Sequence, residues 1–388
     1  MDTKKFETEA IRTQIERTQY LEHSSPLYLT SSFVFEDAED MRASFAEEKD
    51  RNIYSRYSNP NSNEFIEKVC KMEGAEAGFA FASGMAAVFS SLAALLDSGD
   101  HIISAGNIFG STHTLFTSYF PKWNISHSYF KIDDFDFIDT LITPKTKLIY
   151  AETPTNPGVD VLDLKALGKI AKKHNLLLVI DNCFASPYLQ QPIKFGADLV
   201  IHSGTKLMDG QGRVLGGITV GDTELIDKIY RFSRITGPAL SPFNAWVLSK
   251  SLETLALRVD RHCQNALELA KFLEEHKKVN WVKYPFLKSH PKYTIAKEQM
   301  KAGGCVVAFE IKGGLKGGRK FFDAIKLLSL SANLGDSRSI VTHPASTTHS
   351  KLTQKERLTS GITEGLVRIS VGLEHIDDII TDIKQALN

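Results

Sequence analysis

Short apolar runs that alternate with helical patterns are the feature that most limits how this chain can fold. The runs "LLLVIDN" and "ADLVIHSG" are apolar without interruption, which is typical of strands buried on both faces. Further strands are predicted at "AGFAFAS", "HIISAG", "SHSYFK", "TKLIYAE" and "GGITVGD", and helices at "GMAAVFSSLAALL" and "DLKALGKIAKKHN". This alternation predicts an α/β fold with a mostly parallel sheet whose faces are covered by helices.

The pattern changes near Phe243, where "FNAWVLSKSLETLALRVDRHCQNALELAKFLEEHK" forms a long helical pattern that is expected to link two domains. Beyond it, "GGCVVAFEI" and "GLVRISVGLE" predict strands, and "HIDDIITDIKQAL" predicts a final helix. The first fifty or so residues are polar and have no strong period. We therefore predict an N-terminal arm at 1–55, a large domain at 56–245 and a smaller α+β domain at 246–388.

Charge and cysteine content argue against several classes of function. The 46 basic residues balance 46 acidic ones, whereas binding to nucleic acid or a membrane surface needs concentrated positive charge. No run is long and apolar enough to span a bilayer, and the polar start lacks a secretory signal. The four cysteines lack paired spacing and the histidines lack metal-ligand spacing. We expect a cytoplasmic protein with free thiols, no metal and a small molecule as its substrate.

The stretch "HSGTKLMDGQGRVLGG" places Lys206 just after a predicted strand, among small hydroxyl residues. A dinucleotide-binding loop would need a third glycine where Leu215 stands, and a helix where "GGITVGD" predicts a strand. A P-loop would need its glycines before the lysine. In "KGGLKGGRK" the spacing fits, but Arg319 occupies the lysine position. The remaining interpretation is an anchor for an aldehyde cofactor.

Pyridoxal phosphate needs a lysine, an acid that faces its pyridine nitrogen, and donors for its phosphate. Asp181 ends the strand before the one that leads to Lys206, and ligands bind at the carboxyl ends of such strands. Ser203 and Thr205 can donate hydroxyls to the phosphate. Ser83, Gly84 and Met85 open a helix whose N-terminus suits the same anion. Each residue alone also has a plain structural explanation, as a helix cap, a loop residue or a solvated lysine.

The chain resembles the cystathionine γ-synthase/γ-lyase family of pyridoxal-phosphate enzymes of cysteine and methionine metabolism. The resemblance covers nearly the whole chain and is carried, in order, by "YSRYSNPNSNEFIEKVCKMEGAEAGFAFASGMAA", "AETPTNP", "VIDNCFASP", "HSGTKLMDGQGRVLGG", "NLGDSRSIVTHPASTTH" and "GLVRISVGLE". It implies an aspartate-aminotransferase-like fold of type I, with the cofactor bound by the large domain. Within the family, "DGQGRVLGG", "GPALSPFNAWVLSKSLETL" and "NIFGST" are most similar to the sulfhydrylase branch, which acts on O-succinylhomoserine.

The resemblance also implies roles for individual residues. Lys206 would form the Schiff base with the cofactor and then serve as acid and base, while Asp181 would pair with the pyridinium. Asn156 would hydrogen-bond the phenolate oxygen of the cofactor. Arg368 would bind the substrate carboxylate with two parallel hydrogen bonds, next to Asn333, which stands where lyase relatives often have serine. The phosphate would be bound by Ser83, Gly84, Met85, Ser203 and Thr205.

Two further residues imply an active site shared between subunits. Tyr54 and Arg56 would reach from the arm to the phosphate of a neighbouring subunit, and Tyr54 would also be a catalytic residue. The resemblance therefore suggests a homotetramer made of two active dimers. As ordinary arm residues, the same two side chains would have no catalytic role.

Phe109 departs from the pattern of many relatives, which place a tyrosine on the cofactor ring in a Tyr-Gly pair. A phenylalanine ring can stack, but it has no hydroxyl that gives or takes a proton. Proton transfer would then fall to Lys206, Tyr54 or water. Sulfhydrylase-like members also carry phenylalanine here.

The implied reaction is γ-replacement on an O-acylhomoserine with sulfide, which gives homocysteine for methionine biosynthesis. The alternatives within the family are cystathionine γ-synthase, with cysteine as the sulfur donor, and a γ-lyase acting on methionine or cystathionine. An alternative of another class is a non-catalytic protein on a degenerate transferase fold, which would be colourless.

Overall fold

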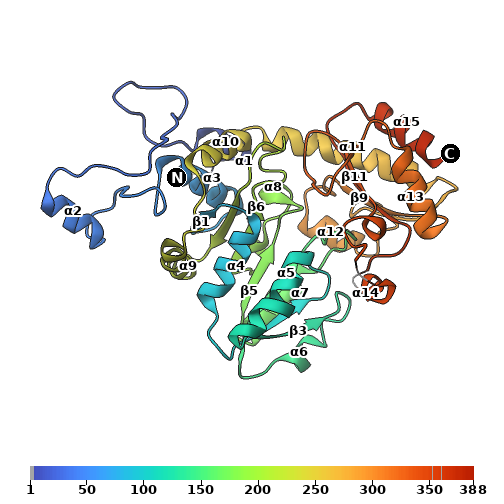
Figure 1. Ribbon diagram of the computed structural model, residues 1–388, viewed down its shortest axis with the longest axis horizontal. Coiled ribbons are helices and arrows are strands. Elements are labelled where there is room, and N and C mark those ends of the chain that lie inside the picture. The colour runs from blue at the N-terminus through green and yellow to red at the C-terminus, as the bar shows by residue number, and fades with distance from the viewer. Residues whose placement is uncertain (1–3, 352, 360) are drawn as a thin grey trace.

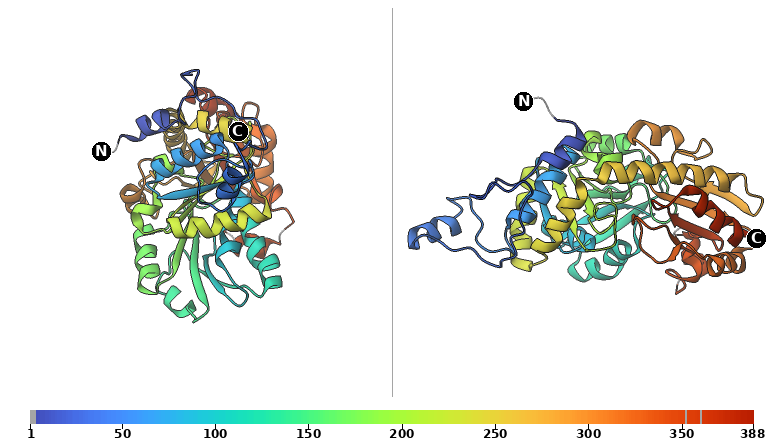
Figure 2. Two further views of the ribbon diagram at one scale, coloured as in Figure 1. Left: turned by 90° about the vertical axis from the view of Figure 1, so that its left-hand side faces the viewer. Right: turned by 90° about the horizontal axis from the view of Figure 1, so that it is seen from above.

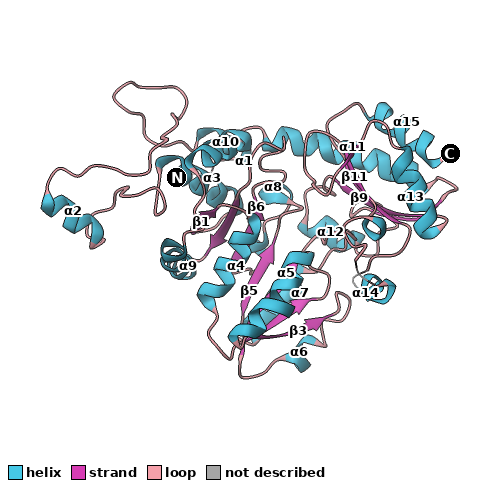
Figure 3. Ribbon diagram, viewed as in Figure 1, coloured by secondary structure: helices cyan, strands magenta, loops and turns pink. Residues whose placement is uncertain are grey.

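A computed structural model describes residues 4–351, 353–359 and 361–388. Figure 1 shows a sheet domain in the middle of the chain, a second sheet towards the C-terminus, and an N-terminal arm that reaches away from both. Figure 3 shows the same view by secondary structure. The predicted α/β fold is confirmed.

The larger sheet has seven strands in the order β1-β7-β6-β5-β4-β2-β3. Their bounds are β1 Ala77–Phe81, β7 Gly217–Gly221, β6 Leu199–Ser203, β5 Leu177–Asp181, β4 Thr146–Glu152, β2 His101–Ala105 and β3 Ser126–Phe130. The strands from β6 to β3 are parallel, whereas β7 runs antiparallel to both β1 and β6. Every strand predicted in this region is present, and the apolar runs at β5 and β6 lie almost wholly buried.

Helices cover both faces of this sheet. In β6, His202 contacts Glu73 of α3 (Pro60–Glu73), whereas the next residue, Ser203, faces the start of α4 (Gly84–Leu95). Because successive side chains of a strand point to opposite faces, α3 and α4 lie on opposite sides of the sheet. Helix α9 (Thr223–Thr236) packs beside α4.

The long helical pattern after Phe243 forms two helices, α10 (Pro242–Leu252) and α11 (Leu255–Glu274). Helix α10 packs on α3, while α11 runs on to the second sheet (Figure 2). The break coincides with Arg258, whose guanidinium donates to the carbonyl of Ser251 and to the hydroxyl of Thr254. The predicted long helical pattern is therefore present as two helices, with Glu253 and Thr254 between them.

The second sheet has five strands in the order β10-β11-β12-β9-β8 and is mainly antiparallel. Their bounds are β10 Ser329–Leu330, β11 Ile340–Thr342, β12 Leu366–Ser370, β9 Val306–Ile311 and β8 Val279–Lys283. Helices α11, α13 (Gly314–Ala324) and α15 (Ile376–Leu387) pack with this sheet around an apolar core of its own. The predicted strands at 303–311 and 365–374 and the final helix are present.

The arm contains two short helices, α1 (Phe6–Arg12) and α2 (Ala38–Phe45), in otherwise irregular chain. Several large apolar side chains of the arm are exposed, including Val34 at 88% and Tyr20 at 81%. The base of the arm is held by Glu64, which accepts hydrogen bonds from the hydroxyls of Ser25 and Ser249. The division at 1–55, 56–245 and 246–388, and contact of the arm with a neighbouring subunit, remain predictions.

The remaining helices are short: α5 Gly110–Thr114, α6 Ile138–Leu141, α7 Leu164–Lys173, α8 Ser186–Leu189, α12 Tyr293–Gln299 and α14 Gln354–Thr359, with a π turn at Leu115–Tyr119 and 3₁₀ turns at Phe120–Trp123, Pro192–Phe195 and Pro344–Ser346. Among the described residues, no helix combines the length and hydrophobicity that crossing a membrane would need. All four cysteines are free thiols, as predicted.

Candidate active site

The carboxyl ends of β4, β5 and β6 bring three polar groups to one edge of the larger sheet. Glu152 ends β4 and lies beside Asp181, which ends β5. Ser203 ends β6, and Lys206 follows in the loop that leads towards β7. Because these strands are parallel and adjacent, their ends meet where ligands bind in open α/β sheets.

Asp181 carries a carboxyl group that accepts few hydrogen bonds. Its Oδ1 accepts the backbone N–H of Cys183 at 3.0 Å, and its Oδ2 lies 3.4 Å from the hydroxyl of Tyr150. Burial raises the pKa of Asp181, although the Cys183 N–H and the nearby His202 act in the opposite direction. A buried cation next to this carboxyl would restore its ionised form, as a pyridinium nitrogen does.

The pKa of the Lys206 amine is lowered by its surroundings. Its Nζ donates a hydrogen bond to Oδ1 of Asn333 at 2.5 Å. Burial lowers the pKa of Lys206, and the positive charge of Arg368 lowers it further, while Cys183 opposes this. A lysine with a lowered pKa can form a Schiff base and can act as a general base near neutral pH.

The start of α4 faces the end of β6. The hydroxyl of Ser83 accepts the N–H of Ala86 at 3.1 Å and so caps the helix. The N–H groups of Gly84 and Met85 precede the first bonded turn, where helices bind anions. A Cβ at position 84 would lie 2.7 Å from the Cβ of Ser203, so only glycine allows this approach. The hydroxyl of Thr205 exchanges hydrogen bonds with the backbone of Gly216.

Arg368 is a buried cation that contacts no carboxylate among the described residues. It donates to Oδ1 of Asn156 at 2.9 Å, to the carbonyls of Ala332 and Asn333, and to the hydroxyl of Thr342. Its Nε is buried and has no partner there. Burial lowers the pKa of Arg368 to about 10, so it is still charged at neutral pH. A buried charge of this kind suits a carboxylate ligand.

Asn156 and Phe109 are both tied to Glu152. The backbone N–H of Asn156 donates to Oε1 of Glu152 at 2.9 Å, and that of Phe109 donates to Oε2 at 2.7 Å. Burial raises the pKa of Glu152, and the neighbouring Asp181 raises it further. The side-chain NH₂ of Asn156 is left as a donor, and the Phe109 ring is 42% exposed.

Glu152 is a site residue that sequence reasoning missed. The same signal that singled out Asp181, an acid at the end of a buried strand, was present in "TKLIYAE". Its importance depends on the two backbone groups it binds, which come from separate loops. These contacts are visible only in the folded chain.

Within the described ranges, the hydrogen bonds and ring contacts of Tyr54 and Arg56 do not involve Lys206 or Asp181. Arg56 lies over the rings of Tyr57 and Tyr54 and donates to the carbonyl of Arg234 on α9. Tyr54 is 41% exposed. Among the described residues, none of these contacts joins either side chain to Lys206 or Asp181 of the same chain. The predicted role at a neighbouring subunit's site therefore remains a prediction.

The donors and acceptors described above fit pyridoxal phosphate. The amine of Lys206, the carboxyl of Asp181 and the N-terminus of α4 with Ser203 and Thr205 provide the three kinds of group that it needs. The buried, unpaired Nε of Arg368 adds a place for the carboxylate of an amino-acid substrate. The described residues hold no group of three or more His, Cys, Asp or Glu side chains that could bind a metal ion.

Comparison with known proteins points the same way. A family model described as Cys/Met metabolism PLP-dependent enzyme matches residues 7–388. An O-succinylhomoserine sulfhydrylase of Pseudomonas aeruginosa is 43% identical, over 98% of this chain and 95% of its own. An L-methionine gamma-lyase of Pseudomonas putida is also 43% identical, over 93% and 92%.

A solved structure gives the cofactor's position in a relative. A putative O-acetylhomoserine (thiol)-lyase of Campylobacter jejuni superposes with a TM-score of 0.94 at 36% identity, covering 98% of this chain and 99% of that one. That structure contains N'-pyridoxyl-lysine-5'-monophosphate, which is the cofactor joined to a lysine.

Proposed function

The chain belongs to the Cys/Met metabolism family of PLP-dependent enzymes, and on that premise we propose that it replaces the acyl group of an O-acylhomoserine by sulfide. O-succinylhomoserine is the favoured ester, and the products are homocysteine and succinate. The cofactor is pyridoxal 5'-phosphate. The similarity to sulfhydrylases supports this choice, although the similarity to methionine γ-lyases is nearly as high.

The observation that carries the proposal is Phe109. A carboxylate leaving group is a stable anion, because its conjugate acid has a pKa of about 4, whereas a thiolate has one of about 8.5 or above. Expelling a thiolate from methionine is therefore helped by a proton donor, and expelling succinate needs none. Phe109 has no hydroxyl to donate, which favours an ester substrate over a thioether.

Arg368 is proposed to bind the substrate's carboxylate. Its Nε is free, and its other nitrogens already contact Asn156 and the backbone of Asn333. These contacts fix the plane of the guanidinium, so that two parallel hydrogen bonds can orient the substrate. The amino acid's α-carbon would then be held near Lys206, whose pKa is lowered by burial and by the charge of Arg368.

Lys206 is proposed to move the protons. Its Nζ takes the proton from the α-carbon and then serves the β-carbon, and Asn333 orients it by accepting one of its hydrogens. When bound, pyridoxal phosphate supplies the electron sink for these steps. The γ-carbon–oxygen bond breaks, succinate leaves with the electron pair, and the sulfur of hydrosulfide forms the new bond at the same carbon. The α- and β-carbons then regain their protons.

The first test of the proposed function compares substrates. We expect kcat/KM for O-succinylhomoserine with sulfide to exceed that for elimination from L-methionine or cystathionine by about 100-fold or more, which is the size of a typical general-acid contribution. Homocysteine formation and 2-oxo acid release are measured on the same preparation, with O-acetylhomoserine and with cysteine as further arms. Equal or faster consumption of methionine would make the protein a γ-lyase.

Phe109→Tyr tests whether the missing hydroxyl at this position favours an ester substrate over a thioether. The new hydroxyl can protonate a departing thiolate, so elimination from methionine should rise by about 10-fold or more while replacement on O-succinylhomoserine changes little. The matched control is Phe137→Tyr, which places the same hydroxyl on an exposed ring. An unchanged ratio of the two activities in the Phe109 variant would remove the main support for an ester substrate.

We further propose that the active site is shared between two subunits, with Tyr54 and Arg56 of each arm reaching the phosphate bound by the other. In support, the arm extends away from the body of its own chain (Figure 1) and exposes large apolar side chains. Arg56 also lies outside the group formed by Lys206 and Asp181.

Mixing two inactive variants tests this sharing. Arg56→Ala and Lys206→Ala each damage one half of a shared site, so a mixed dimer has one fully damaged and one intact site. After subunit exchange in equal amounts, about a quarter of wild-type activity is expected, because half of the dimers are mixed. Exchange is verified by mass. Absence of recovery in verified mixed dimers would mean that each chain completes its own site.

A further inference from the structure

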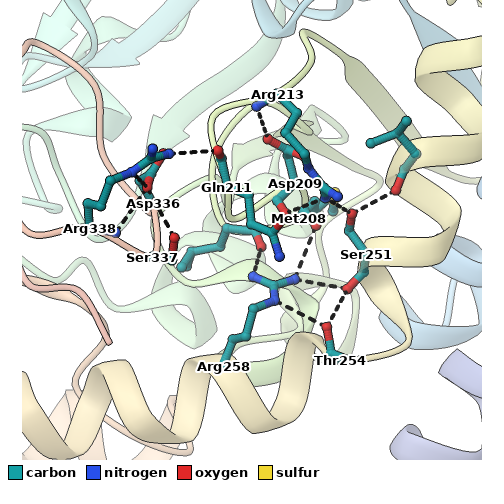
Figure 4. A network of polar contacts seen from close by, with 12 residues as sticks. Met208, Asp209, Gln211, Arg213, Ser251, Thr254, Arg258, Asp336, Ser337 and Arg338 are labelled. Carbon is teal, nitrogen blue, oxygen red and sulfur yellow. Dashed lines mark hydrogen bonds and ion pairs between the residues drawn. The ribbon is translucent and has the colours of Figure 1, made fainter. Parts of the chain in front are cut away.

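The motif "DGQGR" directly follows Lys206-Leu207-Met208, and the proposed chemistry gives it no role. Figure 4 shows that this segment lies between α11 on one side and the loop at 335–338 on the other. The loop at 333–338 also carries Asn333, the acceptor of the Lys206 amine. The position of Lys206 therefore depends on contacts from both α11 and this loop.

Arg258 of α11 binds the backbone immediately after Lys206. Its Nη1 donates to the carbonyl of Leu207 at 2.7 Å, and its Nη2 donates to that of Met208 at 3.2 Å. The same Nη2 donates to the carbonyl of Ser251 at 2.9 Å, so the guanidinium joins the lysine loop to the end of α10. These three acceptors are backbone carbonyls, which hold the position of the chain more directly than side-chain contacts do.

Two glycines of the motif make these contacts sterically possible. Gly210 has φ +69°, and a Cβ there would lie 1.9 Å from Nη1 of Arg258. Gly212 has φ +65°, and a Cβ there would lie 2.5 Å from Oδ2 of Asp336. Only glycine combines a positive φ with such close approaches, so the spacing of "DGQG" matches what surrounds it.

The other side of the segment is fixed by the second domain's loop. The N–H of Ser337 donates to the carbonyl of Gly210 at 2.8 Å. Figure 4 shows the second contact, in which Arg338 donates to the carbonyl of Gln211 at 2.8 Å. Within the segment, the N–H of Gly210 donates to the carbonyl of Lys206 at 2.8 Å. A Cβ at Gly335 would lie 2.8 Å from the backbone nitrogen of Leu207, so this loop packs directly against the peptide bond that follows Lys206.

A buried arginine such as Arg258 is unusual where the contact is purely structural. It is 7% exposed, and burial lowers its pKa to about 10, with Asp209 acting in the opposite direction. Burying a charge is costly, and none of its hydrogen bonds among the described residues reaches a carboxylate. What the guanidinium provides is rigidity, because its planar fork binds two successive carbonyls at once.

We propose that Arg258 is a positioning residue for Lys206. It fixes the backbone on the C-terminal side of the lysine, so that the amine lies where the aldehyde of the cofactor can bond to it and where Asn333 can orient it. This inference rests on the proposed function, since it takes Lys206 to be the residue that bonds the cofactor.

The test uses two forms of the cofactor on the full-length protein freed of its own. Pyridoxal phosphate bonds covalently to Lys206, with loss of water, whereas pyridoxamine phosphate uses the same phosphate and ring contacts but cannot form that bond. In Arg258→Met, the affinity for pyridoxal phosphate should fall by about 10-fold to 100-fold, because a displacement near 1 Å has effects of this size. The affinity for pyridoxamine phosphate should change by less than about 3-fold.

Arg261→Met is the matched control, since it makes the same change on an exposed residue of the same helix. If Arg258→Met does not fold, Arg258→Lys takes its place. Lysine keeps the charge but reaches fewer carbonyls, so a smaller change in the same ratio is expected. An equal loss of both affinities, or no change in their ratio, overturns the positioning role.

The wild-type protein separates this inference from the proposed function. If wild type bound both forms of the cofactor equally and borohydride reduction left no adduct on Lys206, the proposed function would fail whatever Arg258 does. If wild type prefers pyridoxal phosphate and Arg258→Met prefers it equally, only the role of Arg258 fails.

Discussion

Replacing Lys206 with alanine is expected to lower kcat/KM for O-succinylhomoserine and sulfide by about 10,000-fold or more. In the proposed reaction this amine is the general base, and burial lowers its pKa, which favours loss of its proton. No other lysine among the described residues shares its contact with Asn333. Loss of the amine also removes the bond to the cofactor, so the yellow colour of the purified protein should change.

Lys194→Ala is the matched control, because Lys194 is exposed just before β6 and should be replaceable without effect. Activity is measured as homocysteine formation, and the bonded lysine is identified by borohydride reduction and peptide mapping. Finding the cofactor on a different lysine of the wild-type protein would overturn the assignment.

The strands of the larger sheet could be predicted from sequence because their apolar runs are local. Burial on both faces leaves the inner runs "LLLVI" (176–180) and "LVI" (199–201) without polar positions. The strand order is not local. The position of β7 between β1 and β6 depends on how the connections pack across the sheet.

The break between α10 and α11 shows the same limit at one residue. Arg258 fits an amphipathic helical pattern, so the sequence does not indicate that its guanidinium packs against Gly210. That contact depends on where the lysine loop lies, which depends in turn on the completed sheet. Glu152 was overlooked for a related reason, since its partners Phe109 and Asn156 come from different loops.

Lys206 and Asp181 were predicted because an amine and an acid at successive strand ends have a chemical meaning before any fold is known. The structure places them at one edge of the sheet, together with Arg368 through its contact with Asn156. Tyr54 and Arg56 were proposed from resemblance alone. Their role depends on a second chain, so the contacts within one chain can support it but do not test it.

Asp181→Asn is expected to lower kcat by about 1,000-fold or more, which is the upper range for removal of one electrostatic stabiliser of a transition state. Asparagine keeps the shape of the side chain but carries no negative charge, so the ring nitrogen of the cofactor would lose its proton. Reconstitution with a cofactor methylated at the ring nitrogen, whose positive charge is permanent, should recover part of the loss. Near-normal activity of the variant would show that another group keeps the ring cationic.

Without the cofactor, the same substitution is expected to stabilise the folded protein. Burial raises the pKa of Asp181 above its ordinary value of about 4, so the folded state holds this proton more tightly than the unfolded chain does. The free energy of unfolding therefore falls as pH rises through the interval between the two values. At pH 7, cofactor-free Asp181→Asn should melt at a higher temperature than the wild type, with the difference disappearing below about pH 4.

Addition of pyridoxal phosphate should reverse that order. In the proposed site its cationic ring would pair with the carboxylate of the wild type and would meet only a neutral amide in the variant, so the cofactor should raise the melting temperature more in the wild type. Asp181→Glu, which keeps the charge, is the control. A cofactor-induced rise of equal size in the asparagine variant would mean that Asp181 does not face the ring nitrogen, however large the loss of activity.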